Sequence, residues 1–298
     1  MLTHLNPVPE HPKRVVVMGA AGFVARAVVA RLASDKVPVL PLVRGDVDLL
    51  ARNAAETLAA LLLPGDAFVA ASARAPVKNS DMLVENMIMA RAMARALKGR
   101  VSHVVNVSSD AVYADSAEPL NEQSSTAPAS LHGVMHLARE LMFREEVGAP
   151  LANVRPTLIY GSGDPHNGYG PNRFRRLLAR GQDIVLFGEG EEKRDHVDVS
   201  DVAELITGLL YRKSTGNLNI ATGRVHSFRE IAEMMLRQSA ALSRVVGSPR
   251  TGPMPHGGFR PFDITACRGA FPDFEYTKLE EGLARARSEE DALGLRRG

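Results

Sequence analysis

Short apolar runs alternate with amphipathic stretches along the first half of the chain. Residues 14–33 pass from a run of valines through a glycine-rich turn into a stretch whose apolar residues share one helical stripe. Further apolar runs that predict strands, each separated from the next by helix-like sequence, lie at residues 37–43, 66–72, 101–109 and 151–161. Near-continuous apolar strands that alternate with helices are typical of a parallel sheet covered on both faces. We therefore predict an α/β, doubly wound (Rossmann) fold.

The pattern changes after residue 162, where glycine- and proline-rich loops are mixed with short elements. We predict a Rossmann domain over residues 1–162 and a smaller substrate-binding region over residues 163–298. This region is expected to lie over the carboxyl edge of the sheet, where doubly wound folds bind ligands. Parts of residues 196–225 are expected to return to the Rossmann core, and the charged end, residues 284–298, is predicted to be a frayed tail.

Composition excludes several classes of protein. The 298 residues are 45% hydrophobic and carry a net charge of +2, with basic residues spread along the chain. This balance favours a small or neutral partner and indicates neither nucleic acid nor a membrane surface as the target. The single cysteine, Cys267, rules out an internal disulfide and favours a reducing compartment, so we expect a cytoplasmic enzyme.

The glycine turn of residues 19–25 predicts a dinucleotide cofactor. Gly19 suits the sharp turn, Gly22 allows backbone to approach a pyrophosphate, and the small Ala25 allows close helix packing. Because the turn follows a strand and opens a helix, the dinucleotide interpretation outweighs that of an empty turn. The other candidate cofactor contacts, in this turn and at the ends of later predicted strands, are Ala21, Phe23, Val24, Ala70, Ala71, Val107 and Pro156.

The end of the second predicted strand bears on which dinucleotide binds. An NAD site usually has Asp or Glu there for the ribose 2′-hydroxyl, whereas this chain has Arg44. The planar guanidinium of Arg44 suits a 2′-phosphate, so NADP is slightly favoured over NAD. Asp48 is a candidate contact near the adenine. The alternative is that Arg44 is simply solvated at a strand end.

Four ordered segments resemble the extended short-chain dehydrogenase/reductases, the NAD-dependent epimerase/dehydratase family that acts largely on nucleotide-activated sugars. The similarity covers about residues 13–283, and its main segments are residues 104–115 (VVNVSSDAVYAD), 153–161 (NVRPTLIYG), 186–206 and 257–264. It implies that Ser109 hydrogen-bonds the reacting sugar oxygen and that Arg194 and Arg260 bind the diphosphate of a nucleoside-diphosphate sugar. Asp110, Asn172 and Phe187 are the other candidate substrate contacts. Taken singly, each has an ordinary structural explanation, such as a surface ion pair or a turn residue.

The same resemblance exposes two substitutions. Residues 128–140 align with a motif in which the family carries a catalytic tyrosine and, four residues later, a lysine, and here these positions hold His132 and His136. Imidazole exchanges protons near neutral pH without the help that phenol needs, so His132 is a candidate acid/base and His136 a candidate ribose contact. Alternatively, Tyr169 or a water held by Ser109 supplies the proton, or the chain binds ligands without hydride chemistry. A metal site on the two histidines is disfavoured, because other roles are available to both.

The chain lacks residues that other reactions of the family need, and this narrows the choice of reaction. Within the family, dehydration needs an acid directly after Asp110, and this chain has Ala111 there. Cys267 lies outside the motif of the reductases that also epimerise. What remains is reduction of a keto-sugar by NADPH or 4-epimerisation through a transient ketone, with Arg44 favouring reduction slightly. Two methionine-rich amphipathic helices, residues 86–97 and 136–143, are consistent with a homodimer, although a face packed on the sheet predicts the same pattern.

Overall fold

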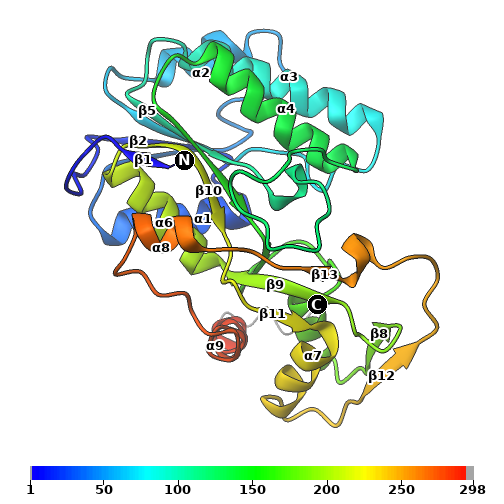
Figure 1. Cartoon of the computed structure of the whole chain (residues 1–298). Coiled ribbons are helices and arrows are strands. Elements are labelled where there is room, and N and C mark those ends of the chain that lie inside the picture. The colour runs from blue at the N-terminus through cyan, green and yellow to red at the C-terminus, as the bar shows by residue number, and fades with distance from the viewer. Residues whose placement is uncertain (1, 293–298) are drawn as a thin grey trace.

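A computed structural model describes residues 2–292, and a seven-stranded sheet forms its centre (Figure 1). The strand order is β1-β10-β6-β5-β4-β2-β3, and all neighbours are parallel except the short first strand, which is antiparallel to β10. The bounds of the strands are β1 (Thr3–His4), β2 (Val15–Met18), β3 (Val39–Leu42), β4 (Ala67–Ala70), β5 (His103–Val107), β6 (Leu151–Pro156) and β10 (Ser214–Ile220). The predicted doubly wound α/β fold is confirmed.

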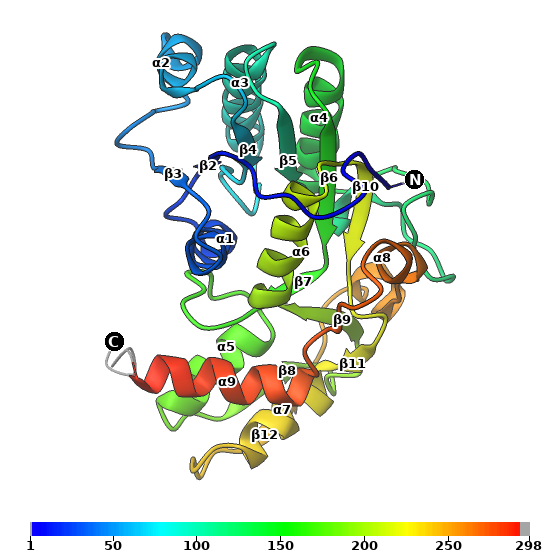
Figure 2. The same ribbon diagram turned by 90° about the vertical axis from the view of Figure 1, so that its left-hand side faces the viewer.

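Helices cover both faces of this sheet (Figure 2). One face carries α1 (Phe23–Ser34) and α6 (Val199–Tyr211), and the other carries α2 (Ala54–Leu61), α3 (Ser80–Leu97) and α4 (Leu131–Glu146). Strand β2 shows why its sequence is apolar without alternation. Val15 and Val17 belong to the core beneath α1 and α6, whereas Val16 and Met18 belong to the core beneath α2 and α3.

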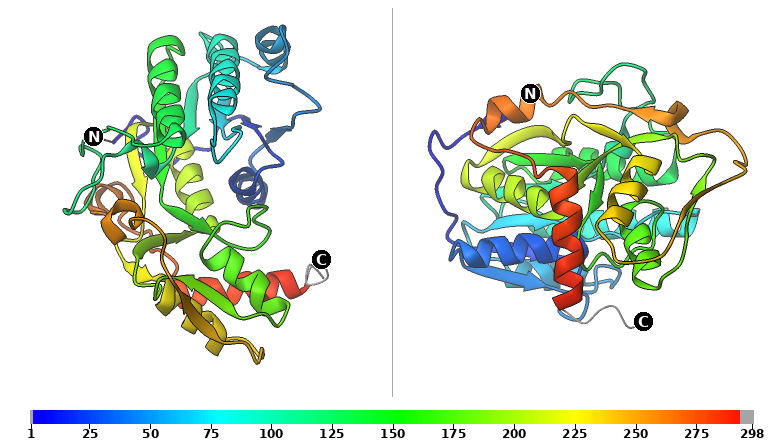
Figure 3. Two further views of the ribbon diagram at one scale, coloured as in Figure 1. Left: turned by 90° about the vertical axis from the view of Figure 1, so that its right-hand side faces the viewer. Right: turned by 90° about the horizontal axis from the view of Figure 1, so that it is seen from below.

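A smaller region lies at the carboxyl edge of the large sheet (Figure 3). It contains a four-stranded sheet, in which β9 pairs with β7, β11 and β13, and a two-stranded sheet of β8 and β12. Its elements are β7 (Leu158–Tyr160), α5 (Pro171–Ala179), β8 (Ile184–Phe187), β9 (Lys193–Asp198), β11 (Val225–Ser227), α7 (Phe228–Arg237), β12 (Val245–Ser248), the 3-10 helix η2 (Pro255–Gly258), β13 (Phe259–Arg260) and α9 (Leu279–Ala292). Between β9 and β11 the chain returns to the large sheet as α6 and β10, and α8 (Thr265–Ala270) packs beside β10.

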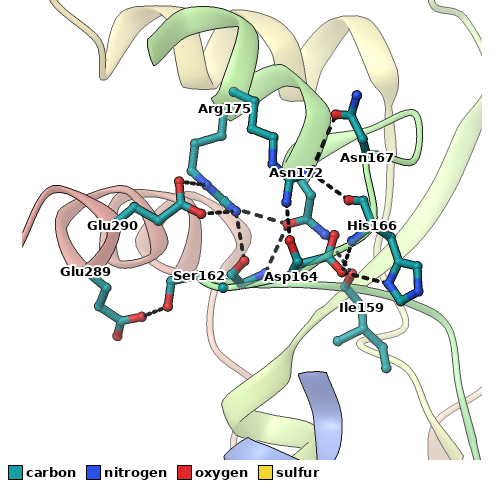
Figure 4. A network of polar contacts seen from close by, with 12 residues as sticks. Ile159, Ser162, Asp164, His166, Asn167, Asn172, Arg175, Glu289 and Glu290 are labelled. Atoms are coloured by element: carbon teal, nitrogen blue, oxygen red, sulfur yellow. Dashed lines mark hydrogen bonds and ion pairs between the residues drawn. The ribbon is translucent and has the colours of Figure 1, made fainter. Parts of the chain in front are cut away.

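The prediction of a frayed tail is wrong for residues 284–292. They belong to α9, which buries Gly282, Leu283 and Ala286. The helix is also tied to the rest of the protein by the buried Arg175, whose guanidinium binds the carboxylate of Glu290 at 2.7 Å (Figure 4). Residues 293–298 lie outside the described residues. No helix within residues 2–292 is both long and apolar enough to cross a lipid bilayer.

Candidate active site

A cleft of about 530 Å³ lies between the carboxyl ends of the central strands and the smaller region. Most of the candidate residues come together in its walls. Those that line it are Gly22, Phe23, Val24, Ala71, Val107, Ser109, Asp110, His132, His136, Pro156, Tyr169, Asn172 and Arg194. Those that do not line it are Gly19, Ala21, Arg44, Asp48, Ala70, Phe187 and Arg260. The cleft therefore joins the glycine turn, the end of β5 and the start of α4 in one space.

The glycine turn has the shape that a dinucleotide requires. Gly19 adopts a φ of +92°, and a Cβ atom there would lie 2.7 Å from Ser72 Oγ and 2.9 Å from the Ser72 backbone nitrogen. Gly22 occupies the N-cap position of α1, where no side chain caps the helix and no acid stands in its first turn. The first N–H groups of α1 are therefore free for an anion. These features fit the pyrophosphate of a nicotinamide dinucleotide.

Arg44 lies outside the cleft at the end of β3. It is 79% exposed, and its guanidinium is 3.3 Å from the carboxylate of Asp48. A pair this exposed adds little stability, so the guanidinium is free to exchange Asp48 for another anion. The neighbouring Asp46 is not free in the same way, because it accepts a hydrogen bond from the backbone nitrogen of Val43 at 2.8 Å.

The N-terminus of α4 brings His132 close to Ser109. Ser130 caps the helix by accepting from Gly133 N, and a Cβ atom at Gly133 would collide with the backbone oxygen of Ala111. Only glycine allows this approach of α4 to the 3-10 helix η1 (Asp110–Val112), which Ser109 caps by accepting from Ala111 N at 3.1 Å. Ser109 lines the cleft, and its hydroxyl donates to Asp110 Oδ1 at 3.3 Å.

The two histidines lie in the cleft wall as a contacting pair. Their ring centroids are 4.7 Å apart and their planes meet at 87°. His132 is half-buried, and its Nδ1 is enclosed without a hydrogen-bond partner, which leaves Nε2 as the nitrogen able to reach a ligand. Burial lowers the pKa of His132 below its ordinary value, although the nearby Asp110 opposes this. Burial lowers the pKa of His136 much further, so both rings are neutral at pH 7.

Tyr169 does not present its hydroxyl to the histidines. Its oxygen accepts a hydrogen bond from the backbone nitrogen of Phe187 at 3.0 Å, at the end of β8. The ring packs against Phe174, Phe187 and Phe228, with centroids 4.5–5.3 Å away. Burial also raises the pKa of this phenol. Tyr169 therefore contributes an aromatic wall, which weakens the hypothesis that it supplies the proton.

The smaller region contributes one arginine with unused hydrogen-bonding capacity. Arg194 on β9 is buried, and its Nη1 lacks a hydrogen-bond partner, with Glu192 Oε1 3.5 Å away. Asp195 does not pair with it, since its carboxylate accepts from Thr222 and Gly223 at 2.8–3.0 Å. A buried donor without a partner is costly, and an anion in the cleft would satisfy it.

Arg260 and Asn172, the other two predicted phosphate contacts, bind groups of the protein itself. Arg260 is 2% exposed and donates to Asp110 Oδ2 at 3.1 Å and to Asp115 Oδ1 at 3.0 Å. Asn172 faces the cleft, but its amide bonds Gly161 N, Ile159 O and the Arg175 guanidinium at 3.3 Å (Figure 4). Arg260 therefore fixes Asp110, which lines the cleft, and Asn172 joins the start of α5 to the end of β7.

Several polar cleft residues escaped the sequence analysis, among them Asp164, His166 and His256. Asp164 and His166 lie in the loop before α5, with the Asp164 carboxylate 3.0 Å from His166 Nδ1 (Figure 4). His256 stands beside Arg260, with its Nδ1 3.0 Å from Arg260 Nη1. The glycine- and proline-rich context of these residues gave only a loop signal. No group of three or more His, Cys, Asp or Glu residues suited to a metal ion occurs within residues 2–292.

Comparison with known proteins shows the family of the chain. The model of the NAD dependent epimerase/dehydratase family matches residues 15–221, well over half of the chain. The chain belongs to this family. A curated relative is the ADP-L-glycero-D-manno-heptose-6-epimerase of Alkalilimnicola ehrlichii, 26% identical in an alignment of 258 residues that covers 74% of this chain and 80% of the relative. The predicted membership of the NAD-dependent epimerase/dehydratase family is thus confirmed.

Solved structures show the same fold. The UDP-glucose 4-epimerase of Thermotoga maritima is 22% identical with a TM-score of 0.79, over 94% of this chain and 99% of that one. The UDP-glucuronic acid 4-epimerase of Bacillus cereus, solved with UDP-glucuronic acid and NAD, is 16% identical with a TM-score of 0.78, again over 94% and 99%. At these identities the likeness establishes the architecture alone.

Proposed function

We propose that the protein transfers hydride between a nicotinamide dinucleotide and a nucleoside-diphosphate sugar, with His132 as the acid/base. The observation that carries this proposal is the position of His132, which faces the same cleft as Ser109 and the glycine turn. A ring turned to bulk solvent would have removed the basis for such chemistry. Family membership supports a sugar nucleotide as the substrate class.

His132 begins the reaction as a base. Its neutral Nε2 takes the proton of a sugar hydroxyl while the Ser109 hydroxyl hydrogen-bonds the same oxygen, and the C–O bond becomes a ketone as the carbon loses hydride. A bound nicotinamide supplies the acceptor for that hydride and can return it. When the ketone is reduced, the imidazolium of His132 gives its proton back to the oxygen, so protons and electrons balance.

The lowered pKa of His132 sets an expected pH dependence. Oxidation of the sugar needs the neutral ring, so its rate should rise with pH through a pKa below 6.5 and stay level above it. Reduction needs the imidazolium and should fall over the same interval. Reduction of a keto-sugar and 4-epimerisation both use these steps, and Arg44 favours NADP and hence reduction.

The proposal is tested by replacing His132 with Phe and with Gln. Purified protein is given NAD or NADP with a panel of nucleoside-diphosphate sugars and keto-sugars, and turnover is followed by nicotinamide absorbance and by mass spectrometry. Loss of a general acid/base should lower kcat by about 10²–10⁴-fold. His11→Phe, at an exposed histidine outside the cleft, is the matched control.

Two results would overturn the proposal. Unchanged turnover in both His132 variants would remove this residue from the chemistry. Tight binding of cofactor and sugar nucleotide by the unaltered protein, without product in long incubations, would favour the alternative of a ligand-binding protein that has lost hydride transfer.

A further inference from the structure

Arg139 is buried directly behind the two histidines. It lies on α4, three residues after His136, and is 2% exposed. Its guanidinium donates to Ser72 O at 2.9 Å and to Val107 O, so it joins the segments that follow β4 and end β5. Its remaining contact is with His136, whose Nδ1 lies 3.5 Å from Nη2.

Within residues 2–292 no carboxylate forms an ion pair with Arg139, although the nearby charge of Glu140 partly opposes the lowering of its pKa. Glu140, the next residue, gives its oxygens to Arg155 at 2.6 and 3.0 Å and to Ser108 at 2.5 Å. The guanidinium therefore relies on carbonyl dipoles at the carboxyl ends of parallel strands. Burial lowers the pKa of Arg139 to about 10, which still leaves it cationic at neutral pH. An unpaired buried cation is costly to fold, so its position calls for an explanation.

The contact with His136 has one chemically consistent form. A guanidinium carries only donors, so Nδ1 of His136 must present its lone pair to Arg139. The proton of the neutral ring is then on Nε2, the only N–H that His136 can offer to a ligand in the cleft. Protonation at Nδ1 would set a second donor and a second positive charge against the guanidinium, and this opposes charging of His136.

We propose that Arg139 is a positioning residue of the active site, which holds His136 as a permanently neutral Nε2–H donor and leaves His132 as the ring that exchanges protons. His136 then hydrogen-bonds an uncharged acceptor, such as a hydroxyl of the cofactor or substrate. This inference rests on the proposed function for its use in turnover, but the tautomer it assigns belongs to the free protein.

The groups around the histidine pair are compatible with this division of roles. Arg139 faces both rings from within α4 and lowers the pKa of each. Asp110 on η1 acts on His132 in the opposite direction. Because the carboxylate favours protonation of His132 alone, the two histidines are set apart although their rings touch.

The test is ¹⁵N NMR of the imidazole rings in the ligand-free protein between pH 5.5 and 8.5. We expect His136 to show a protonated Nε2 and an unprotonated Nδ1 at every pH, whereas His132 titrates. In Arg139→Met, which removes the donor that faces Nδ1, His136 should show a mixture of rings protonated at Nδ1 and at Nε2, and the pKa of His132 should rise. In Arg139→Lys, which keeps the charge, both should remain close to the unaltered protein. Melting temperatures and cofactor binding identify any variant that does not fold.

The unaltered protein alone can overturn the inference. A proton on Nδ1 of His136, or an ordinary titration of that ring, would do so even if no variant folds. An Arg139→Met spectrum identical to that of the unaltered protein would also do so. Where the protein turns over, the pH at which sugar oxidation is half-maximal should move up in Arg139→Met. If the tautomer is as expected but no substrate reacts, the proposed function fails and the assignment of Arg139 to His136 stands.

Discussion

Arg260 Nε lies 3.1 Å from a carboxylate oxygen of Asp110, and the same guanidinium reaches Asp115. Arg260→Leu would leave these carboxylates without their cation, so we expect a loss of about 2–4 kcal/mol in the free energy of unfolding. Urea denaturation measures it. Arg144→Leu is the control, because the pair of Arg144 with Glu145 is exposed and should cost less than about 1 kcal/mol. Equal stability of the two variants would contradict the structural role of Arg260.

Arg194→Leu should behave in the opposite way. Its Nη1 has no hydrogen-bond partner and its ion pair with Glu192 is long, at 3.5 Å, so its removal should cost less stability than Arg260→Leu does. Loss of a charge-assisted hydrogen bond to phosphate should weaken sugar-nucleotide binding about 10- to 100-fold. Calorimetric titration with uridine and adenosine diphosphate sugars checks this. An unchanged affinity would show that Arg194 does not bind the diphosphate.

The fold was predictable because its signals are local. The apolar strands, the glycine turn and the helical stripes each occupy one continuous stretch, and residues 14–33 form the strand, turn and helix as expected. The prediction of a frayed tail over residues 284–292 was wrong because it too used local sequence alone. The charged sequence of this segment gave no sign that Glu290 would meet Arg175, which is 115 residues away.

The site was predictable only where a motif marked it. The alignment with the family's catalytic positions made His132 and His136 candidates, and in the structure both line one cleft. Arg139 left no signal, because a charged residue on an amphipathic helix is normally assigned to the solvated face. What overrides that expectation is a pair of carbonyls, Ser72 O just after β4 and Val107 O at the end of β5, which no local pattern reveals.

Cofactor choice can be tested at Arg44. Arg44→Asp should lower the affinity for NADP relative to NAD by at least about tenfold, since a carboxylate repels the 2′-phosphate and accepts from a 2′-hydroxyl. Fluorescence titration with both dinucleotides measures the ratio. Arg52→Asp makes the same charge change at an exposed position nearby and should leave the ratio as it is. If Arg44→Asp also leaves the ratio unchanged, Arg44 does not bind the 2′-phosphate.

A homodimer is expected through the outer faces of α3 and α4. These helices pack side by side and expose Val84 at 56% and Val134 at 39% (Figure 2). Replacing both valines with Glu should give a folded monomer in sedimentation velocity, because charges buried in an apolar interface are unpaired. Val185→Glu, at a valine 52% exposed on β8, should leave the assembly intact. A double variant that sediments like the unaltered protein would place any interface elsewhere.

Acid should destabilise the protein in part through His103. Its Nε2 is 2.7 Å from Ser214 O, its Nδ1 is buried without a partner, and burial lowers its pKa to about 4. The unfolded chain, with a pKa near 6.5, takes up the proton first. Above pH 6.5 His103 therefore does not lower the free energy of unfolding. As the pH drops towards 4 it lowers this free energy, by about 2 kcal/mol between pH 7 and pH 5.

His103→Gln isolates this contribution, because an amide can still donate to Ser214 O and does not titrate in this range. Urea unfolding at pH 7 and at pH 5 gives, for each protein, the loss in the free energy of unfolding between the two pH values. This loss should be smaller by about 2 kcal/mol in the variant than in the unaltered protein. Asp195 and Asp201, whose pKa values burial raises to about 6, act with the opposite sign in both proteins and cancel in the comparison. The same acid sensitivity in both proteins would mean that His103 is not held neutral by its burial.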